Sequence, residues 1–507
     1  MDHKNRQINL GWIPFGYAYS VPLSCGYLKS SLLTAGYPNV KIFDFNQDFW
    51  HRNRDTLGSG VRPFEERYQS ILQNVTNWNN PENYYEHIHS ISSISDLIEE
   101  YSNSLLENNP SIIGMTIFNT NLWFSVEICK RLKEKNNSVQ IILGGPEATA
   151  SSYDSEHNHI LKDLLKDGTI DVVVFGEGDV TIVEVCNTIL SNEHDYTSID
   201  GVYYYHDGEI KTNKWRRFIG NVSEIPIPDY SDIDFSLYQQ PEIPIVLSRG
   251  CNYGCLYCGV KLYWKQAKDF RKRTAESVME EIVNIDHSGY ITKGQFNFLS
   301  FKGAYVNTLD NHLETLCDSI IEYYKEKEHG VPFQWGGWAR VHKNLTADVC
   351  KKLYDSGCHH LTFGFESGSV RINKEMRKGY DFREYNNEYA AKIFKNCADA
   401  GIQVVLFLII GYPTETESDF QETMTFLKEN NDSIDAVYCM STFILSRVMF
   451  NDDDKTWGKS SFGIKGDDPH PVFWESETNT YDERLARLET FKTFAEENDL
   501  TTISNRK

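Results

Sequence analysis

Short apolar runs alternate with amphipathic helical patterns along this chain, and the alternation occurs in two separate series. The first series starts at Ile8 and the second at Ile243. Two strands that are joined by a helix pair in parallel, because the helix returns the chain to the starting end of the sheet. The sequence therefore predicts an α/β protein with two parallel-sheet domains, and its 507 residues are enough to give each domain its own core.

The first series predicts a doubly wound, Rossmann-like domain over residues 1–215. Its expected strands and helices lie at residues 8–13, 22–35, 40–45, 112–118, 122–135, 139–143, 172–175 and 180–190. A polar, aromatic-rich insertion at 46–109 contains an amphipathic helix near 94–106, and the sequence assigns this insertion no role. Alternating residues at 197–214, around Asp207-Gly208, predict a hairpin that closes the domain.

The second series occupies residues 243–445. Its expected strands lie at 243–247, 296–301, 333–341, 360–365, 404–410 and 436–445, and its expected helices at 275–285, 309–327, 347–355, 386–400 and 417–428. A stretch punctuated by prolines, 225–230, places the linker between the domains at 216–242. Residues 446–507, with a helical pattern near 483–496, are expected to form a helical cap on the second domain.

Net charge and composition restrict the partners. The chain has 72 Asp and Glu against 50 Lys and Arg, a formal net charge of -22 that repels phosphate backbones and disfavours a nucleic-acid substrate. A small molecule or a peptide is the expected substrate. The sequence has no apolar run of membrane-spanning length and no signal-like segment at its start, and its eleven cysteines are scattered. We therefore expect a cytoplasmic protein that does not enter a membrane.

Three cysteines, Cys251, Cys255 and Cys258, follow the first expected strand of the second series in a C-x3-C-x2-C pattern. Three thiolates in one short loop can bind one face of an iron-sulfur cube, but they leave one iron without a protein ligand. Such an iron can chelate the amine and carboxylate of S-adenosylmethionine (SAM) and pass an electron to it. A zinc site would need a second cysteine pair or histidines at knuckle spacing, and none follows.

With Tyr257 directly before the last cysteine, this motif resembles that of the radical SAM superfamily. The resemblance implies a 4Fe-4S cluster, SAM as cofactor and a partial (β/α)6, TIM-like barrel formed by the six expected βα units. A barrel carries its chemistry at the carboxyl ends of its strands. The cysteine loop lies at such an end.

The resemblance also assigns SAM-binding roles at the end of the fourth barrel strand. Within Gly364-Phe-Glu-Ser, Glu366 would bind the ribose hydroxyls or the ammonium group of SAM, and Ser367 would contact a neighbouring polar atom. A simpler alternative is that the Glu366 carboxylate only pairs with Arg371 or Lys378.

Two further strand ends receive roles in the same way. Gly411, after the fifth strand, resembles part of the region that holds adenine, and Glu415 either belongs to that region or lies in the first turn of a helix. Arg340, after the third strand, is expected to clamp the SAM carboxylate or to form an ion pair at the barrel rim. The chain has Lys302-Gly303 where relatives carry an acidic segment for the methionine amine, which leaves that contact without a candidate.

In the first domain, small and polar residues follow the third, fourth and fifth strands. They are Asn119 and Thr120, then Gly144, Gly145, Pro146 and Glu147, then Gly176, Glu177 and Gly178. Ligands of doubly wound sheets bind at these strand ends, and glycine allows close approach to backbone N–H groups. Alone, the pattern fits tight turns equally well. Together with the barrel, it resembles the cobalamin-binding domain of B12-dependent radical SAM enzymes.

One departure concerns the lower ligand of cobalt. Cobalamin domains of the mutase and methionine-synthase type carry D-x-H-x-x-G, whose histidine binds cobalt, and this chain has no such motif. The B12-dependent radical SAM group often lacks it too. The lower axial position is therefore left to a non-ligating side chain, a water or nothing.

The resemblance implies an enzyme that methylates an unactivated carbon of a small molecule or peptide. It would use a 5'-deoxyadenosyl radical, methylcobalamin, and an electron donor such as flavodoxin or ferredoxin. Relatives with the same architecture also catalyse cyclisation, ring contraction or rearrangement without methyl transfer, so this class remains an alternative. A cobalamin or redox sensor is the third possibility, and the SAM-binding features count against it.

Overall fold

The computed structural model describes most of the chain, and its described residues form two compact units that meet in sequence at Glu242 and Ile243. The described residues are 3–16, 20–53, 94–118, 120–152, 159–238, 242–260, 270–291, 298–308, 310–378, 386–439, 442–445, 462–466 and 473–502. None of the described helices is both long and apolar enough to cross a lipid bilayer.

The first unit is built on a seven-stranded sheet with the order β2-β1-β3-β4-β5-β6-β7. Its strands are β1 (Ile8–Trp12), β2 (Val40–Asp44), β3 (Ile112–Thr116), β4 (Gln140–Gly144), β5 (Val172–Val174), β6 (Val202–His206) and β7 (Glu209–Thr212). The first five are parallel, and β6 and β7 form the antiparallel hairpin predicted around Asp207-Gly208. The central strand β3 is buried along its whole length because helices cover both faces of the sheet.

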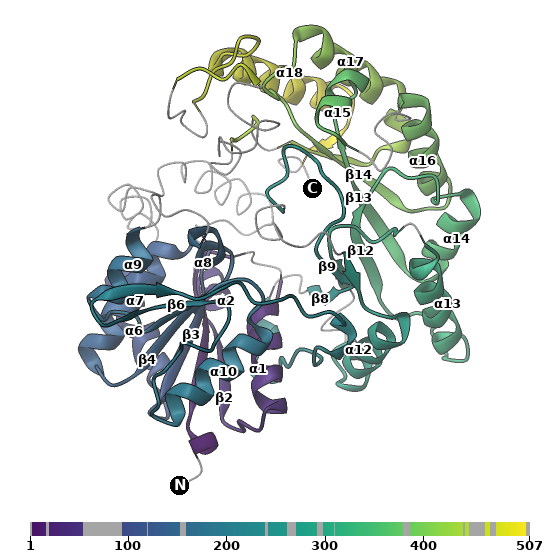
Figure 1. Cartoon of the computed structure of the whole chain (residues 1–507). Coiled ribbons are helices and arrows are strands. Elements are labelled where there is room, and N and C mark those ends of the chain that lie inside the picture. Colours follow the sequence, from purple (N-terminus) through teal and green to yellow (C-terminus); the bar gives the residue numbers. More distant parts are fainter. Residues whose placement is uncertain are drawn as a thin grey trace. The chain divides into compact units, whose positions relative to one another are not determined.

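Helices α1 and α10 cover one face of this sheet, and α6 and α7 cover the other (Figure 1). The helices are α1 (Leu23–Thr34), α2 (Phe45–Arg52), α6 (Ile94–Leu105), α7 (Leu122–Lys135), α8 (Pro146–Ser151), α9 (His159–Lys166) and α10 (Gly178–Leu190). Of the predicted insertion at 46–109, residues 54–93 lie outside the described part, and α2 and α6 lie at its two ends. The short helices α2, α8 and α9 were not predicted, because segments of six to eight residues carry little periodicity.

Residues in the stretch predicted as a linker pack against the first unit. The ammonium group of Lys29 on α1 lies 2.9 Å from Asp229 Oδ1 and 2.7 Å from Asp232 Oδ2. Gly26 leaves room for Tyr230, whose Cε1 would lie 2.6 Å from a Cβ at that position. These contacts hold the stretch to α1, and two short 3-10 helices, Val222–Glu224 and Phe235–Leu237, lie within it.

The second unit contains a second seven-stranded sheet, with the order β16-β15-β14-β13-β12-β11-β8. Its strands are β8 (Glu242–Val246), β11 (Phe298–Lys302), β12 (Gln334–Ala339), β13 (Cys358–Glu366), β14 (Gln403–Leu408), β15 (Ala436–Tyr438) and β16 (Thr501–Thr502). The neighbours from β11 to β16 pair in parallel. β16 is a seventh strand that the sequence did not predict, because two residues show no pattern. It comes from the segment expected to be only a helical cap.

Helices follow the strands along the outer side of this curved sheet (Figure 1). They are α12 (Ala275–His287), α13 (His312–Tyr324), α14 (Ala347–Asp355), α15 (Val370–Glu375), α16 (Asn387–Asp399), α17 (Glu417–Glu429) and α18 (Tyr481–Glu497). A short hairpin of β9 (Ser248–Arg249) and β10 (Arg271–Lys272) follows β8. The strand predicted at 436–445 ends at Tyr438, because Thr442 and Phe443 pair instead with Ile410 beyond β14.

Candidate functional site

The cysteine loop begins directly after β9, as a loop at the carboxyl end of the first barrel strand should. Cys255 is buried, and Cys251 and Cys258 are partly buried. The loop is tied down on two sides: Leu256 N–H donates to Met376 O at 2.8 Å, and Tyr305 Oη donates to Asn252 Oδ1 at 2.9 Å. The three thiols are thus held in one short segment of fixed backbone.

Two cations, one beyond β12 and one beyond α15, lie within electrostatic reach of these thiols. Burial raises the pKa of Cys251 and of Cys258, while the Lys378 ammonium lowers both values and the Arg340 guanidinium lowers that of Cys251. Positive charge there favours thiolates, which are the iron ligands. Within the described residues, no three His, Cys, Asp or Glu side chains converge on one metal ion. A cubane needs no such point, because each cysteine binds a different iron.

Tyr257, Glu366 and Lys378 form a compact three-way contact beside the cysteine loop. Tyr257 Oη donates to Glu366 Oε1 at 2.8 Å, and Lys378 Nζ lies 2.7 Å from the same carboxylate oxygen and 2.6 Å from Tyr257 Oη. Burial and the Glu366 charge raise the pKa of the Tyr257 hydroxyl well above its ordinary value. This three-way contact joins Tyr257, which lies between Cys255 and Cys258, to the end of β13.

Glu366 adopts a backbone conformation that favours glycine. Its φ is +69°, the register between β13 and β14 shifts between Gly364 and Glu366, and Ile409 N–H donates to Glu366 O at 2.9 Å. A non-glycine residue held in this region costs on the order of 1 kcal/mol or more, and such strain is typical of functional sites. Of the two alternative partners, Lys378 pairs with Glu366, whereas Arg371 pairs with Asp419 and Glu375.

Ser367 lies in the interior rather than at the mouth of the barrel. Its side chain is completely buried, its Oγ lies 3.2 Å from Thr423 Oγ1 on α17, and Ser369 N–H donates to it at 3.1 Å. These bonds connect the end of β13 to α17. The predicted SAM contact of Ser367 stays a prediction, and the geometry gives its hydroxyl a structural role.

Arg340 lies beyond β12 among aromatic rings. Its guanidinium carbon is 3.2 Å from the centre of the Tyr253 ring and 5.7 Å from that of Tyr305. Its backbone is fixed by a reciprocal pair of 2.8 Å bonds with the Asn307 amide. Arg340 forms no ion pair with the described residues, so the rim ion pair left open by the sequence is not found there. Stacking leaves the edge of a guanidinium able to bind a carboxylate.

At Lys302 and Gly303, the end of β11 lies against the segment that leads into the cysteine loop. Leu247 N–H donates to Lys302 O at 2.8 Å, and Gly303 lies so close to Ser248 that a Cβ would meet the Ser248 hydroxyl. Glycine is needed here for close approach of the two segments.

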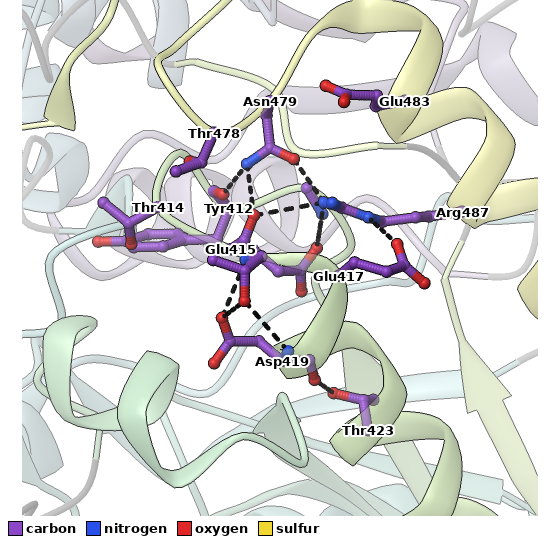
Figure 2. Close-up of polar contacts among 12 residues, drawn as sticks. Tyr412, Thr414, Glu415, Glu417, Asp419, Thr423, Thr478, Asn479, Glu483 and Arg487 are labelled. Carbon is purple, nitrogen blue, oxygen red and sulfur yellow. Dashed lines mark hydrogen bonds and ion pairs between the residues drawn. The ribbon is translucent and has the colours of Figure 1, made fainter.

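The loop after β14 is held by a buried carboxylate, which Figure 2 shows. Gly411, with φ +81°, donates its N–H to Glu415 Oε2 at 2.7 Å. Burial raises the pKa of Glu415 to about 7, although the Gly411 bond and Arg487, 3.6 Å away, both lower it. Glu415 is not in the first turn of α17, because Thr416 is the N-cap residue and forms a capping box with Asp419.

Aromatic side chains line part of the inner face of the barrel sheet. Along β12, Trp335 packs outward under the helices, whereas Trp338, two residues before Arg340, is 54% exposed. The Trp338 ring contacts the Phe407 ring edge-on, with 6.1 Å between the ring centres. The centres of the Phe407 and Tyr438 rings are 5.6 Å apart. These three rings come from the carboxyl-terminal halves of β12, β14 and β15.

In the first unit, Gly145 turns the chain sharply between β4 and α8. Its φ is +109°, and a Cβ there would lie 2.8 Å from Thr116 Cγ2 and 2.9 Å from Ile117 O. Pro146 is the first residue of α8, and Glu147 N–H donates to Ile117 O at 3.1 Å. Gly144 differs, since a Cβ there would make only ordinary contacts, the nearest 3.4 Å from Val174 O.

The loops after β3 and β5 are also held by bonds of their own. Thr120 Oγ1 donates to Phe15 O at 2.7 Å, and Asn119 lies outside the described residues. Gly176, with φ +78°, donates its N–H to Thr149 Oγ1 at 3.1 Å. Glu177, the residue before Gly178 at the start of α10, accepts Ile219 N–H at 2.8 Å.

The N–H group of Gly176 is therefore not free for a ligand, contrary to what a glycine at a strand end suggests, and that of Glu147 is bonded as well. Gly176 N–H bonds to a side chain of α8 and Glu147 N–H to a carbonyl after β3, because buried backbone groups need a partner. What remains is a set of three rigid turns at the carboxyl ends of neighbouring parallel strands, where doubly wound sheets bind their ligands. The three turns thus lie where a cobalamin site is expected in a sheet of this kind.

Sequence reasoning missed the residues that hold the β14 loop, Asn479, Arg484 and Arg487. No local pattern marks them, since their contacts with the loop span 64 to 73 positions. The sequence suggests Lys378 only as an alternative partner of Glu366. Its position after a short helix gave no sign that it reaches the cysteine loop.

Comparisons with known proteins identify the two units. The model of the radical SAM superfamily matches residues 245–427, and that of the B12 binding domain matches residues 90–186. The uncharacterized methyltransferase PH0819 of Pyrococcus horikoshii is 27% identical over 349 residues, 67% of this chain and 70% of that protein.

Two solved structures share the fold. The radical SAM methyltransferase TsrM from Kitasatospora setae, with cobalamin and a [4Fe-4S] cluster bound, superposes with a TM-score of 0.62 at 14% identity over 86% of this chain and 74% of its own. The cobalamin-dependent SAM radical enzyme OxsB, with aqua-cobalamin bound, gives 0.61 at 16% identity over 98% of this chain and 57% of its own.

The order of the two matched domains, B12-binding before radical SAM, is the order predicted from the strand ends and the cysteine loop. The cofactors of this chain are accordingly a [4Fe-4S] cluster, SAM and cobalamin. The chain therefore combines, in this order, the B12-binding and radical SAM domains that characterise cobalamin-dependent radical SAM enzymes.

Proposed function

We propose that this enzyme is a methyltransferase that methylates an unactivated carbon of a small molecule or peptide. The observation that carries the proposal is the presence of a B12 binding domain and a radical SAM domain on one chain. The relative from Pyrococcus horikoshii is named a methyltransferase, and so is TsrM. A cytidylyl-2-hydroxyethylphosphonate methyltransferase of Streptomyces wedmorensis, 21% identical over 387 residues, supports the same reaction class.

When bound, the reduced cluster supplies an electron to SAM, and cobalamin carries the methyl group. Cys251, Cys255 and Cys258 hold the cluster in this proposal. Arg340 binds the SAM carboxylate through the edge of its stacked guanidinium, and Glu366 accepts hydrogen bonds from the ribose or the ammonium group. An electron donor such as flavodoxin or ferredoxin reduces the cluster.

Other residues position these groups. Tyr257 and Lys378 hold Glu366 and join it to the cysteine loop, and Gly411 with its loop holds the adenine. Within the first unit we assign residues 1–215 as the cobalamin domain, and the turns after β3, β4 and β5 would bind the corrinoid. Residues 243–445 form the barrel, 216–242 connect the two, and 446–507 complete the second unit.

The exposed ring of Trp338 supports a substrate with a planar or apolar portion. A tryptophan exposed on the inner face of a barrel, next to Phe407, offers a stacking surface at the end where barrels carry their chemistry. TsrM has been solved with tryptophan as substrate, which fits a site of this kind. We propose a small molecule or a peptide side chain that stacks on Trp338.

The test is the fate of SAM during turnover. Anaerobic protein with reductant, methyl-labelled SAM and extracts of candidate substrates should transfer label to product at carbon. It should also form S-adenosylhomocysteine and 5'-deoxyadenosine in about equal amounts, because one SAM supplies the methyl group and another the hydrogen abstraction. Sustained 5'-deoxyadenosine without labelled product would assign the enzyme instead to cyclisation, ring contraction or rearrangement. A sensor would form neither beyond slow abortive cleavage.

A further inference from the structure

The segment Trp474–Arg487, which begins 59 positions after the β14 loop in sequence, encloses that loop. We call residues 411–415 the β14 loop and residues 474–487 the clamp segment. The clamp segment contains the start of α18, and its contacts with the β14 loop are almost all hydrogen bonds to backbone, which fix the path of the chain whatever its side chains.

Carbonyl groups of the β14 loop accept bonds from clamp side chains. Asn479 Nδ2 donates to Tyr412 O at 2.8 Å and to Glu415 O at 3.0 Å (Figure 2). Ser476 Oγ and Thr478 Oγ1 each donate to Pro413 O at 2.7 Å. Asn479 is 1% exposed, so water does not compete for these bonds.

Arg487 joins the clamp segment to the carboxylate that holds Gly411. Its Nη1 donates to Asn479 Oδ1 at 2.5 Å and to Glu415 O at 3.3 Å, and lies 3.6 Å from Glu415 Oε2. Its Nε donates to Glu417 Oε2 at 3.0 Å. The Glu415 carboxylate in turn accepts a hydrogen bond from Gly411 N–H. The Arg487 guanidinium therefore influences the position of Gly411 through the Glu415 carboxylate.

Gly411 also packs directly against the clamp. A Cβ on Gly411 would lie 2.6 Å from Arg484 Cγ, and the Arg484 side chain is fully buried, with its guanidinium carbon 3.7 Å from the centre of the Trp474 ring. Arg484 Nη1 donates to Trp474 O at 2.7 Å. Arg484 thus fills the space on one side of Gly411 and leaves the other side for a ligand.

We propose that the clamp segment is a positioning element for SAM, and that Arg487 and Asn479 are positioning residues that act through Glu415 and the β14 loop backbone. They hold the Gly411 peptide in the conformation that receives the adenine end of SAM. The inference rests on the adenine-binding role of the β14 loop in the proposed function. It adds the C-terminal part of the second unit to the SAM site.

The experiment measures SAM binding without substrate, so it does not depend on methyl transfer. Anaerobically reconstituted Arg487→Gln and Asn479→Ala are compared with the wild type by SAM dissociation constant, iron content, Tm and the EPR change that SAM causes in the reduced cluster. We expect SAM to bind at least 10-fold more weakly and the EPR change to require correspondingly more SAM, with iron content retained. Arg487→Lys should restore part of the affinity, because it keeps the positive charge beside Glu415.

Lys492→Gln is the matched control, since Lys492 lies on the same helix and, within the described part of the chain, its one ion pair is with Glu489 at the surface. It should bind SAM as the wild type does. If Arg487→Gln lowers Tm strongly, Thr478→Val provides a milder test, because Ser476 still donates to Pro413 O. Wild-type SAM affinity in Arg487→Gln and Asn479→Ala, or in a well-folded Thr478→Val, would overturn the proposal. Weakened SAM binding in an enzyme that forms no methylated product would support the clamp and refute only the methylase assignment.

Discussion

At the scale of single residues, the ion pair between Lys378 and Glu366 is the contact that best explains the geometry at the barrel mouth. Both side chains are nearly buried, with exposed fractions of 13% and 7%, and the pair shares one carboxylate oxygen with Tyr257. Lys378 also lies over Gly364, where a Cβ would meet its ammonium group. The glycine therefore makes room for the cation that holds Glu366 in its strained conformation.

This arrangement predicts that Lys378→Met destabilises the protein by about 3 kcal/mol, because the buried Glu366 carboxylate would lose its charged partner. The free energy of unfolding is measured by urea denaturation followed by tryptophan fluorescence. The double variant Lys378→Met with Glu366→Gln should recover part of the loss, since it buries no unpaired charge. A loss below about 0.5 kcal/mol in the single variant would mean that water or a rearranged side chain compensates Glu366.

At the scale of elements, each candidate site is a turn at the carboxyl end of a parallel strand, and its geometry is fixed by glycines and by hydrogen bonds, many of them to neighbouring segments. The turn between β4 and α8 shows how. Gly145 requires its positive φ and the absence of a Cβ, whereas the neighbouring Gly144 has an ordinary environment. Gly145 is thus required for the turn to fold, whereas a Cβ at Gly144 would be accommodated.

We predict that Gly145→Ala weakens hydroxocobalamin binding at least 10-fold and lowers the Tm of the apoprotein, because its Cβ would collide with Thr116 and with the Ile117 backbone. Gly144→Ala is the matched variant, and it should leave the Tm within about 2 °C of the wild type. Binding is measured by absorbance titration. Wild-type cobalamin affinity in Gly145→Ala would show that this turn does not form the site.

At the scale of the whole molecule, the two units hold different cofactors on separate cores. The cysteines of the cluster loop all belong to the second unit, and the turns assigned to cobalamin all belong to the first. Each sheet has its own strand order and its own set of covering helices. Loss of one cofactor should therefore leave the fold of the other unit intact.

Changing Cys251, Cys255 and Cys258 together to Ala should reduce the bound iron from about four per chain to near zero and remove the 4Fe-4S absorbance. The same variant should still bind hydroxocobalamin with an affinity within about threefold of the wild type, because the first unit keeps its sheet. Iron analysis and absorbance titration measure both quantities. A triple variant that keeps its full iron content would place the cluster elsewhere in the chain.

Much of this protein is determined by the sequence alone. Short apolar runs and helical patterns of period 3.6 are local signals, so the order of the longer strands and helices in both units follows from them, whereas α2, α8, α9 and β16 do not. The cysteine spacing is local as well, and it predicted the superfamily that the comparisons identify. The hairpin at Asp207-Gly208 was predictable for the same reason, since a two-residue turn carries its own chemistry.

Only the tertiary structure decided which distant groups meet. Lys378 reaches Tyr257 across 121 positions, and Asn479 reaches the Tyr412 carbonyl across 67. A buried carboxylate or carbonyl must find a partner, but the partner can come from any segment that the fold brings close, and no local pattern marks it. The sequence thus determined the elements and the metal-binding loop, whereas packing of the strand ends against α18 and against the end of α15 decided how the SAM site is held.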